Sequence, residues 1–452
     1  MGSVKIPEFL TTRQKSRYNS ILDLCEGVSK FCDIIKENQV TDSSLLTYVG
    51  VDSSLNGTGL AFSIPWEIDD NHESETLLSL KLRICNLVFS HRLTTDEDSE
   101  KFFKMFSQYL EDDEELEISY FYFFQDAALA GKMIHHNLKN CVLAYDNFNG
   151  RLILSFSINH NSIIGSSEPM KLLSISMFIN LIFSSLVRLI EYMMVVSTIF
   201  INEERLPWYS DNVCEKIVIK CHKALAIMRE HGNNSYTRQL LSSNKERPIL
   251  PIIAMEEINS SRDFAGLRAT SMSYAATKMA IARQLIRISR VSLLKHNGII
   301  ISCPKSSMAS FAKKSISDIA DSYKDQVAGL RFKKDKIDQA AFVRTITGVD
   351  APNDDIADSI CLAYYAKNYY EFLQRMIKVL MFLDIISIED GELIFTPDLY
   401  HLVPDEAEFK AKIEKAYKII GTLVKKHFFN LNTIKNSVTV NAVKHNLSYD
   451  LL

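Results

Sequence analysis

Four carboxylate side chains lie at positions where strands end or a helix begins. Asp52 follows one apolar, strand-like run and Glu256 follows another, while Asp355 and Asp358 lie near the start of a predicted helix. The three-residue spacing of Asp355 and Asp358 puts both carboxylates on one helical face. Asp358 is surrounded in sequence by apolar residues, and an unpaired carboxylate is costly to bury there. We therefore expect the four acids to meet at a divalent cation.

Carboxylate oxygens are the ligands that hard cations such as Mg²⁺ prefer. Two such ions about 4 Å apart can activate water and stabilise the leaving oxygen when a phosphodiester is cleaved. A structural interpretation competes at the helix start, because Asn353 and the acids after it also make a good N-cap. Asp354 and Glu257 each lie one position from a chosen ligand, so the choices between Asp354 and Asp355 and between Glu256 and Glu257 stay open.

The elements that must position these acids alternate between strand and helix patterns, which indicates an α/β fold around a mixed sheet. We predict hairpins around 45–62, 142–158 and 389–392, strands at 251–255 and 298–302, and helices at 12–37, 210–231, 265–296, within 305–348, from 354 onward and at 405–427. Cys303 is expected to be a buried structural thiol, and His160 an ordinary surface or loop histidine.

The net charge of −4 over 452 residues conceals two opposed segments. Residues 205–349 contain 24 Lys and Arg against 12 Asp and Glu, while residues 67–204 contain 10 against 21. A basic segment of this size can bind a polyanion, because each cation placed on a phosphate releases condensed counterions. The acidic segment, including the run 111–115, is expected to be a solvated or partner-facing surface.

The most apolar stretch, 172–200, has an uncharged part of only 16 residues before Arg188. A membrane span needs about 20 predominantly apolar residues, so a buried helix or an oligomer interface is expected and no membrane partner. The chain begins without an apolar signal segment, and its eight Cys form no CxxC pair. We therefore expect an intracellular protein that is not secreted.

The ordered motifs resemble those of RuvC-like Holliday junction resolvases, which belong to the ribonuclease H-like nuclease superfamily. The segment 49–61 is similar to the first motif, 253–257 to the second, and 354–360 to the final Asp-rich helix, while Lys334-Asp335-Lys336-Ile337 resembles the basic third motif. The resemblance implies a mixed five-stranded sheet flanked by helices, with Asp52, Glu256, Asp355 and Asp358 on Mg²⁺ or Mn²⁺ and Lys334 near the scissile phosphate.

The resemblance divides the chain into an arm at 1–44, a nuclease core at 45–66 and 205–367, a mostly helical insertion at 67–204 and an α+β extension at 368–452. The long insertion and the extension depart from a compact resolvase and suggest a viral or phage enzyme. Asn259 stands where relatives tend to carry an aromatic residue after the catalytic Glu. This departure concerns junction specificity more than cleavage.

The leading hypothesis is a metal-dependent endonuclease that cleaves branched DNA as a homodimer, because symmetric cleavage of a four-way junction needs two active sites. The candidates for contacting the DNA backbone are Arg331, Lys333, Lys334, Lys336, Arg283 and Arg287. A catalytically inactive binding or architectural protein is the first alternative. Another ribonuclease H-like nuclease, of the transposase or packaging type, is the second, and an actin-like or sugar kinase-like ATPase ranks last because a second phosphate loop is not found.

Overall fold

The computed structural model describes residues 6–37, 46–65, 138–160 except 147, ten residues within 168–183, 249–257, 264–289, 298–389, 392–395, 405–429 and 438–439. The predicted helix at 210–231, the acidic run 111–115 and most of the apolar stretch 172–200 lie outside these residues.

The described strands are β1 (Leu46–Ser53), β2 (Gly57–Pro65), β3 (Leu138–Asp146), β4 (Arg151–Asn159), β5 (Ile249–Glu256), β6 (Ile299–Cys303), β7 (Ile386–Glu389), β8 (Glu392–Phe395) and β9 (Val438–Thr439). The described helices are α1 (Thr12–Glu37), α8 (Phe264–Ser289), α9 (Lys305–Ile319), α10 (Tyr323–Val327), α11 (Ile337–Thr347), α12 (Asp354–Phe382) and α14 (Glu406–Lys426).

The main sheet is mixed, and its strands run in the order β3-β4-β2-β1-β5-β6-β9. Strands β3, β4, β2 and β1 pair antiparallel, whereas β1, β5 and β6 pair parallel. Five central strands flanked by helices confirm the predicted α/β class, and β3 and the two-residue β9 extend this sheet at its edges. The hairpin β3–β4, predicted around 142–158 inside the insertion, is thus part of the main sheet.

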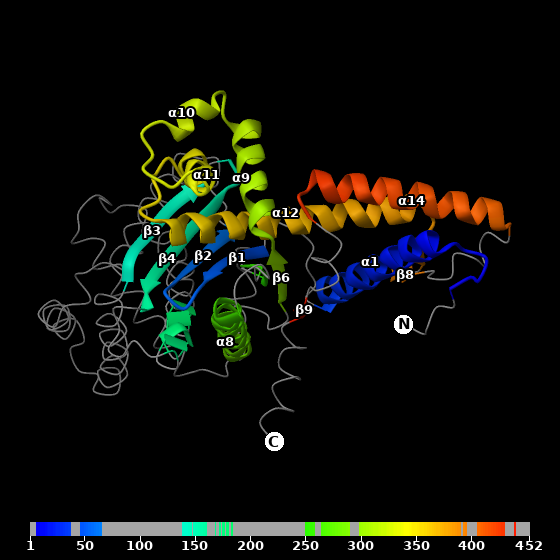
Figure 1. Ribbon diagram of the computed structural model, residues 1–452, viewed down its shortest axis with the longest axis horizontal. Helices are drawn as coiled ribbons and strands as arrows, with labels where there is room; N and C mark the ends of the chain where they lie inside the picture. Colours follow the sequence, from blue (N-terminus) through cyan, green and yellow to red (C-terminus); the bar gives the residue numbers. More distant parts are fainter. Residues whose placement is uncertain are drawn as a thin grey trace, which may run out of the picture.

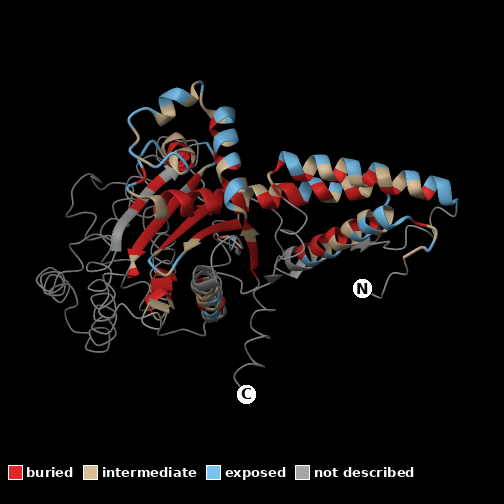
Figure 2. Cartoon of the chain, in the orientation of Figure 1, coloured by how far each residue is buried: buried red, intermediate tan, exposed pale blue. Residues whose placement is uncertain are grey.

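Helices cover both faces of the sheet. Helix α12 crosses one face, with α9 and α11 beside it, while α8 lies on the opposite side (Figure 1). Six consecutive residues of β1 are buried, as expected for a central strand covered on both faces. The side of α12 that faces the sheet is buried, and so are the strands beneath it. The outer sides of α9 and α14 are exposed (Figure 2).

Two glycines allow α12 to lie directly against the sheet. A Cβ on Gly50 of β1 would lie 1.9 Å from the carbonyl oxygen of Ser359, and one on Gly59 of β2 would lie 2.1 Å from that of Asp355. Real Cβ atoms do not approach backbone this closely, so any larger residue would push the helix away. The start of α12 is therefore placed by backbone contact, and this contact sets the position of Asp358.

The second half of α12 extends beyond the sheet and packs with α1 and α14 (Figure 1). Tyr18 of α1 and Phe409 of α14 meet edge to face at 5.7 Å between ring centroids, and Arg17 pairs with Glu414. Helix α12 is continuous through residue 367, where the predicted core ends. The predicted arm and extension are therefore packed against each other and joined to the core by one helix.

Several local predictions are confirmed and one is wrong. Cys303 is buried, and β7 and β8 form the predicted hairpin, whose residues 390–391 lie outside the described residues. His160 is fully buried, where its two ring nitrogens bond the hydroxyls of Thr58 and Ser174, each at 2.8 Å. The absence of metal-ligand spacing indicated a surface position, but the polar partners that allow burial come from distant elements.

The described residues of the apolar stretch are consistent with a buried helix. Ile175, Ile179 and Ile182 are buried, and the ring of Phe183 meets that of Phe62 in β2 edge to face at 5.2 Å. Among the described residues, no helix is both long enough and apolar enough to cross a bilayer.

Candidate metal centre

Three of the four predicted ligands converge. One carboxylate oxygen each from Asp52, Glu256 and Asp358 lies within 4.8 Å of the others, so a single cation could contact all three. Among the described residues, this is the group of acids, histidines or cysteines with a geometry suited to a metal ion. The acids come from β1, β5 and α12, which are separated by about 200 and 100 residues of sequence.

Strand register explains why Asp52 and Glu256 meet. β1 and β5 are adjacent and parallel, and Val51 lies opposite Met255, so the next residue of each strand is an acid at the same sheet edge. Both strands are apolar and buried up to this point, at residues 49–51 and 252–255. Asp358 then reaches the same edge from one turn inside α12, because Gly50 lets the helix approach.

Burial and mutual repulsion make this cluster unfavourable without a cation. Burial, then the charges of Asp358 and Glu256, raise the pKa of Asp52 well above its usual range. Burial also raises the pKa of Asp358 to about 6, although the nearby Lys336 ammonium opposes this shift. Like charges that share a buried site resist ionisation together. A divalent cation would remove this repulsion.

One oxygen of Asp358 indicates where a cation would fit. Asp358 is fully buried, its Oδ2 accepts a bond from Lys336 Nζ, and its Oδ1 has no hydrogen-bond partner. Buried polar atoms without partners are uncommon, and each needs a physical explanation. The acidic donor set is the type that Mg²⁺ and Mn²⁺ prefer. The three carboxylates and the unsatisfied oxygen therefore fit a hard divalent cation.

Lys336 is the basic residue that reaches the acids. Burial disfavours its charged form, but the charges of Asp358, Asp52 and Glu256 outweigh burial and raise its pKa. The motif resemblance placed Lys334 near the scissile phosphate and gave Lys336 only a DNA-backbone role. In the structure Lys334 is exposed on the loop before α11, while Lys336 forms the N-cap of that helix. The sequence signal that could have identified Lys336 was the need of the buried Asp358 for a positively charged partner.

The structure separates the neighbouring acids. Glu257 is exposed one residue beyond β5, so Glu256 is the acid of this pair in the cluster. Asp355 lies outside the cluster, because one of its carboxylate oxygens is 2.9 Å from the position of a Cβ on Gly57 in β2. Asp354 is also outside the cluster, at the first position of α12.

The predicted DNA contacts fall in two places. Arg331, Lys333 and Lys334 are exposed on the loop between α10 and α11. Arg283 is exposed on α8, which covers the other face of the sheet (Figure 1). Arg287 also belongs to α8, but its side chain is outside the described residues. Of these two groups, the loop cations directly precede Lys336, which contacts Asp358 of the acid cluster.

No protein-family model, curated protein or solved structure matches this chain. The resemblance to resolvases therefore stays a prediction from the motifs.

Proposed function

We propose that this chain is a metal-dependent endonuclease that hydrolyses phosphodiesters in branched DNA, most like a RuvC-type Holliday junction resolvase. The observation that carries the proposal is the convergence of Asp52, Glu256 and Asp358 within 4.8 Å, with one buried oxygen of Asp358 left without a partner. The five central strands with helices on both faces support a ribonuclease H-like core.

The side chains have distinct proposed roles. Asp52, Glu256 and Asp358 would hold Mg²⁺ or Mn²⁺, which when bound supplies Lewis-acid stabilisation of the phosphoryl oxygens and lowers the pKa of attacking water. Lys336 holds the charge of the acids in balance and offers its ammonium to a non-bridging phosphate oxygen. Arg331, Lys333 and Lys334 would contact neighbouring phosphates and position the strand.

The proposal is tested with labelled four-way junction, flap, duplex and RNA–DNA hybrid, each incubated with and without Mn²⁺. We expect cleavage of the branched DNA only with the metal, abolished by Asp52→Asn while junction binding persists. Asp318→Asn is the matched control, because Asp318 is an exposed acid on α9 paired with Lys314. Full activity of Asp52→Asn would contradict the proposal.

Two copies of the chain are expected to act on one junction, because symmetric cleavage needs two active sites. Light scattering with and without a four-way junction measures this stoichiometry. A constant single copy per cleaved junction would contradict the homodimer.

A catalytically inactive DNA-binding protein is the second candidate. The observation that favours it is the contact of Lys336 with Asp358, which already supplies one positive charge to the cluster. Isothermal titration with Mn²⁺ separates the two candidates. Binding that is lost in Asp358→Asn supports the nuclease, and absence of binding in the unaltered chain supports the inactive protein.

A further inference from the structure

A groove of about 570 Å³ lies at the start of α12, about one helical turn before Asp358. One wall is the loop segment 329–332, and the other is the segment 350–355 that leads into α12. Both walls continue directly into the site: Lys336 lies four residues after the first wall, and Asp358 lies three residues after the second. A volume of this size is within the range of small-ligand sites, about 300–1,000 Å³.

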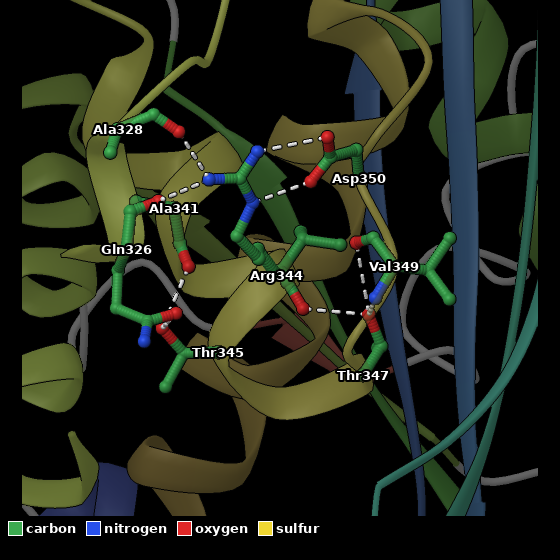
Figure 3. Close-up of polar contacts among 9 residues, drawn as sticks. Gln326, Ala328, Ala341, Arg344, Thr345, Thr347, Val349 and Asp350 are labelled. Atoms are coloured by element: carbon green, nitrogen blue, oxygen red, sulfur yellow. Dashed lines mark hydrogen bonds and ion pairs between the residues drawn. The ribbon is translucent and has the colours of Figure 1, made fainter.

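Arg344 joins the two walls (Figure 3). Its NH1 group donates to the carbonyl oxygens of Gln326 and Ala328, at 3.2 and 2.7 Å, just before the first wall. Its other guanidinium nitrogens donate to both oxygens of Asp350 on the second wall. A planar, bidentate guanidinium contact fixes orientation as well as distance. The groove is therefore held open by the fold before any ligand binds.

The rim of the first wall is basic. Arg331 lines the groove, and Lys333 and Lys334 follow it. All three side chains are exposed, and none has an ion-pair partner in the part of the chain that the structure describes. The nearby Asp335 instead pairs with Lys305. Cations that no acid neutralises suit the phosphates of a nucleic acid strand.

The inside of the groove offers an aromatic surface and a hydrogen-bond acceptor. Phe332 packs partly against the hydrophobic core and also lines the groove, so its ring is supported from behind. Asp350 already accepts hydrogen bonds from Arg344. Asn353 accepts the backbone N–H of Ile356 as the N-cap of α12, and its amide donates to the Ser157 hydroxyl. Asp354 accepts no hydrogen bond and makes no ion pair among the described residues. The other acid of this segment, Asp355, packs with its carboxylate against Gly57 of β2, so the Asp354 carboxylate is the acceptor that we assign to a ligand.

We propose that this groove binds one nucleotide of the substrate strand, next to the scissile phosphate. The phosphate lies against Arg331, the base stacks on Phe332, and an amino group on the base edge donates to Asp354. This inference rests on the proposed nuclease function and adds sequence preference to it. Cytosine, adenine and guanine each carry an exocyclic amino group. Thymine has carbonyl oxygens on both sides of its single N–H, which the Asp354 carboxylate repels.

Cleavage of a set of four-way junctions, varied at each base within two nucleotides of the cut, tests the preference. We expect one position at which thymine lowers the cleavage rate about tenfold, the size of one good base-edge contact. Asp354→Asn should remove or reverse this order, because an amide can donate to thymine O4. Glu406→Gln is the control, since Glu406 is an acid in the first turn of α14, and it should keep the original order.

Equal cleavage of all four bases at every position by the unaltered chain would overturn the inference and leave the nuclease proposal standing. An order unchanged by Asp354→Asn would do the same. Absence of cleavage of every substrate would instead contradict the nuclease function.

A second measurement does not depend on catalysis. Junctions carrying 2-aminopurine at each position near the cut are bound in Ca²⁺, and the fluorescence of the base is recorded. Stacking on Phe332 should quench one position, and Phe332→Ala should restore its emission and weaken binding about fivefold or more. Phe382→Ala is the control, because Phe382 is a 70% exposed aromatic residue at the end of α12. Quenching that persists in Phe332→Ala would overturn the inference.

Discussion

Two buried aspartates, one within α12 and one bonded to it through Tyr364, show how a structural acid differs from a candidate metal ligand. Asp146, at the end of β3, and Asp358 are each fully buried. Asp146 accepts bonds from the backbone of Phe148 and Asn149, from the Asn149 side chain and from Tyr364, so both of its oxygens are satisfied. Asp358 has one oxygen on Lys336 and the other without a partner.

The difference indicates what each acid does. A buried carboxylate with complete hydrogen bonding stabilises the fold, because it also satisfies donors that would otherwise be buried without an acceptor. A buried carboxylate left partly unsatisfied beside two other acids destabilises the fold and requires a function to explain it. We therefore assign Asp146 a structural role in the β3–β4 hairpin and propose a metal-binding role for Asp358.

Asp358→Asn gives the largest expected effect. We expect the cleavage rate to fall more than about 100-fold, because a lost ligand misplaces the cation that the reaction needs. Denaturant unfolding without metal at neutral pH should show equal or higher stability, because the raised pKa of Asp358 means that its charged form destabilises the fold at that pH. Cleavage assays and urea titration measure the two effects, and Asp318→Asn is the exposed control. If Asp358→Asn kept its activity and lost stability, Asp358 would be a structural acid like Asp146 and the assignment would be contradicted.

Asp146→Ala should have the opposite profile. We expect the free energy of unfolding to fall by about 3 kcal/mol, because buried donors of Phe148, Asn149 and Tyr364 lose their acceptor. The folded fraction should retain its cleavage rate. Asp405→Ala is the graded control: Asp405 accepts two backbone N–H bonds as the exposed N-cap of α14, so its loss should cost about 1 kcal/mol. Equal effects of the two variants in urea titration would contradict the assignment.

Lys336→Met should lower stability by about 2 kcal/mol without divalent ions, because the acids lose their cation. Added Mn²⁺ should narrow this difference and bind more tightly than in the unaltered chain, since no ammonium competes at Asp358. Urea titration with and without Mn²⁺, together with calorimetry, measures both changes. Lys314→Met removes an exposed helical ion pair and is the control. Weaker Mn²⁺ binding by Lys336→Met would show that the lysine supports the metal site instead.

The pH dependence of stability tests how Asp358 is buried in the absence of a metal ion. The pKa of folded Asp358 is raised to about 6 from an ordinary value of 3.8, so the folded state holds more protons than the unfolded state between these values. Without metal, stability should therefore fall as pH rises from about 4 to about 6; Asp358 contributes at most about 1.4 kcal/mol per pH unit to this fall, and the raised pKa of Asp52 acts in the same direction. Asp358→Asn should reduce this slope. A slope unchanged in Asp358→Asn would contradict the raised pKa.

The sequence predicted the elements that depend on local pattern. The helices at 12–37 and 405–427 have regular apolar spacing, and the hairpin was predicted from the turn residues 389–392. The structure has α1, α14 and β7–β8 at these places. Asp52 and Glu256 were also predictable, because each directly follows a buried strand. Gly50 and Gly59 could be seen in the sequence, but their contact with α12 depends on tertiary packing.

Features that depend on tertiary partners were not predicted. Asp355 and Asp358 share a helical face, yet the close packing on Gly57 and Gly59 directs Asp355 to β2 and away from the cluster. Lys336 and Lys334 look equivalent in sequence, and only the start of α11 distinguishes them. The pairing of α1 with α14 joins residues almost 400 positions apart.

The central claim is that Asp52, Glu256 and Asp358 form a metal centre. Anomalous diffraction from crystals of the full chain soaked in Mn²⁺ tests it most directly. We expect a peak among these three side chains, at about 2.0–2.3 Å from the ligating oxygens, that is absent from crystals of Asp358→Asn. The proposal would be contradicted if Mn²⁺ bound elsewhere and no peak lay among the three acids, with Lys336 still in contact with Asp358.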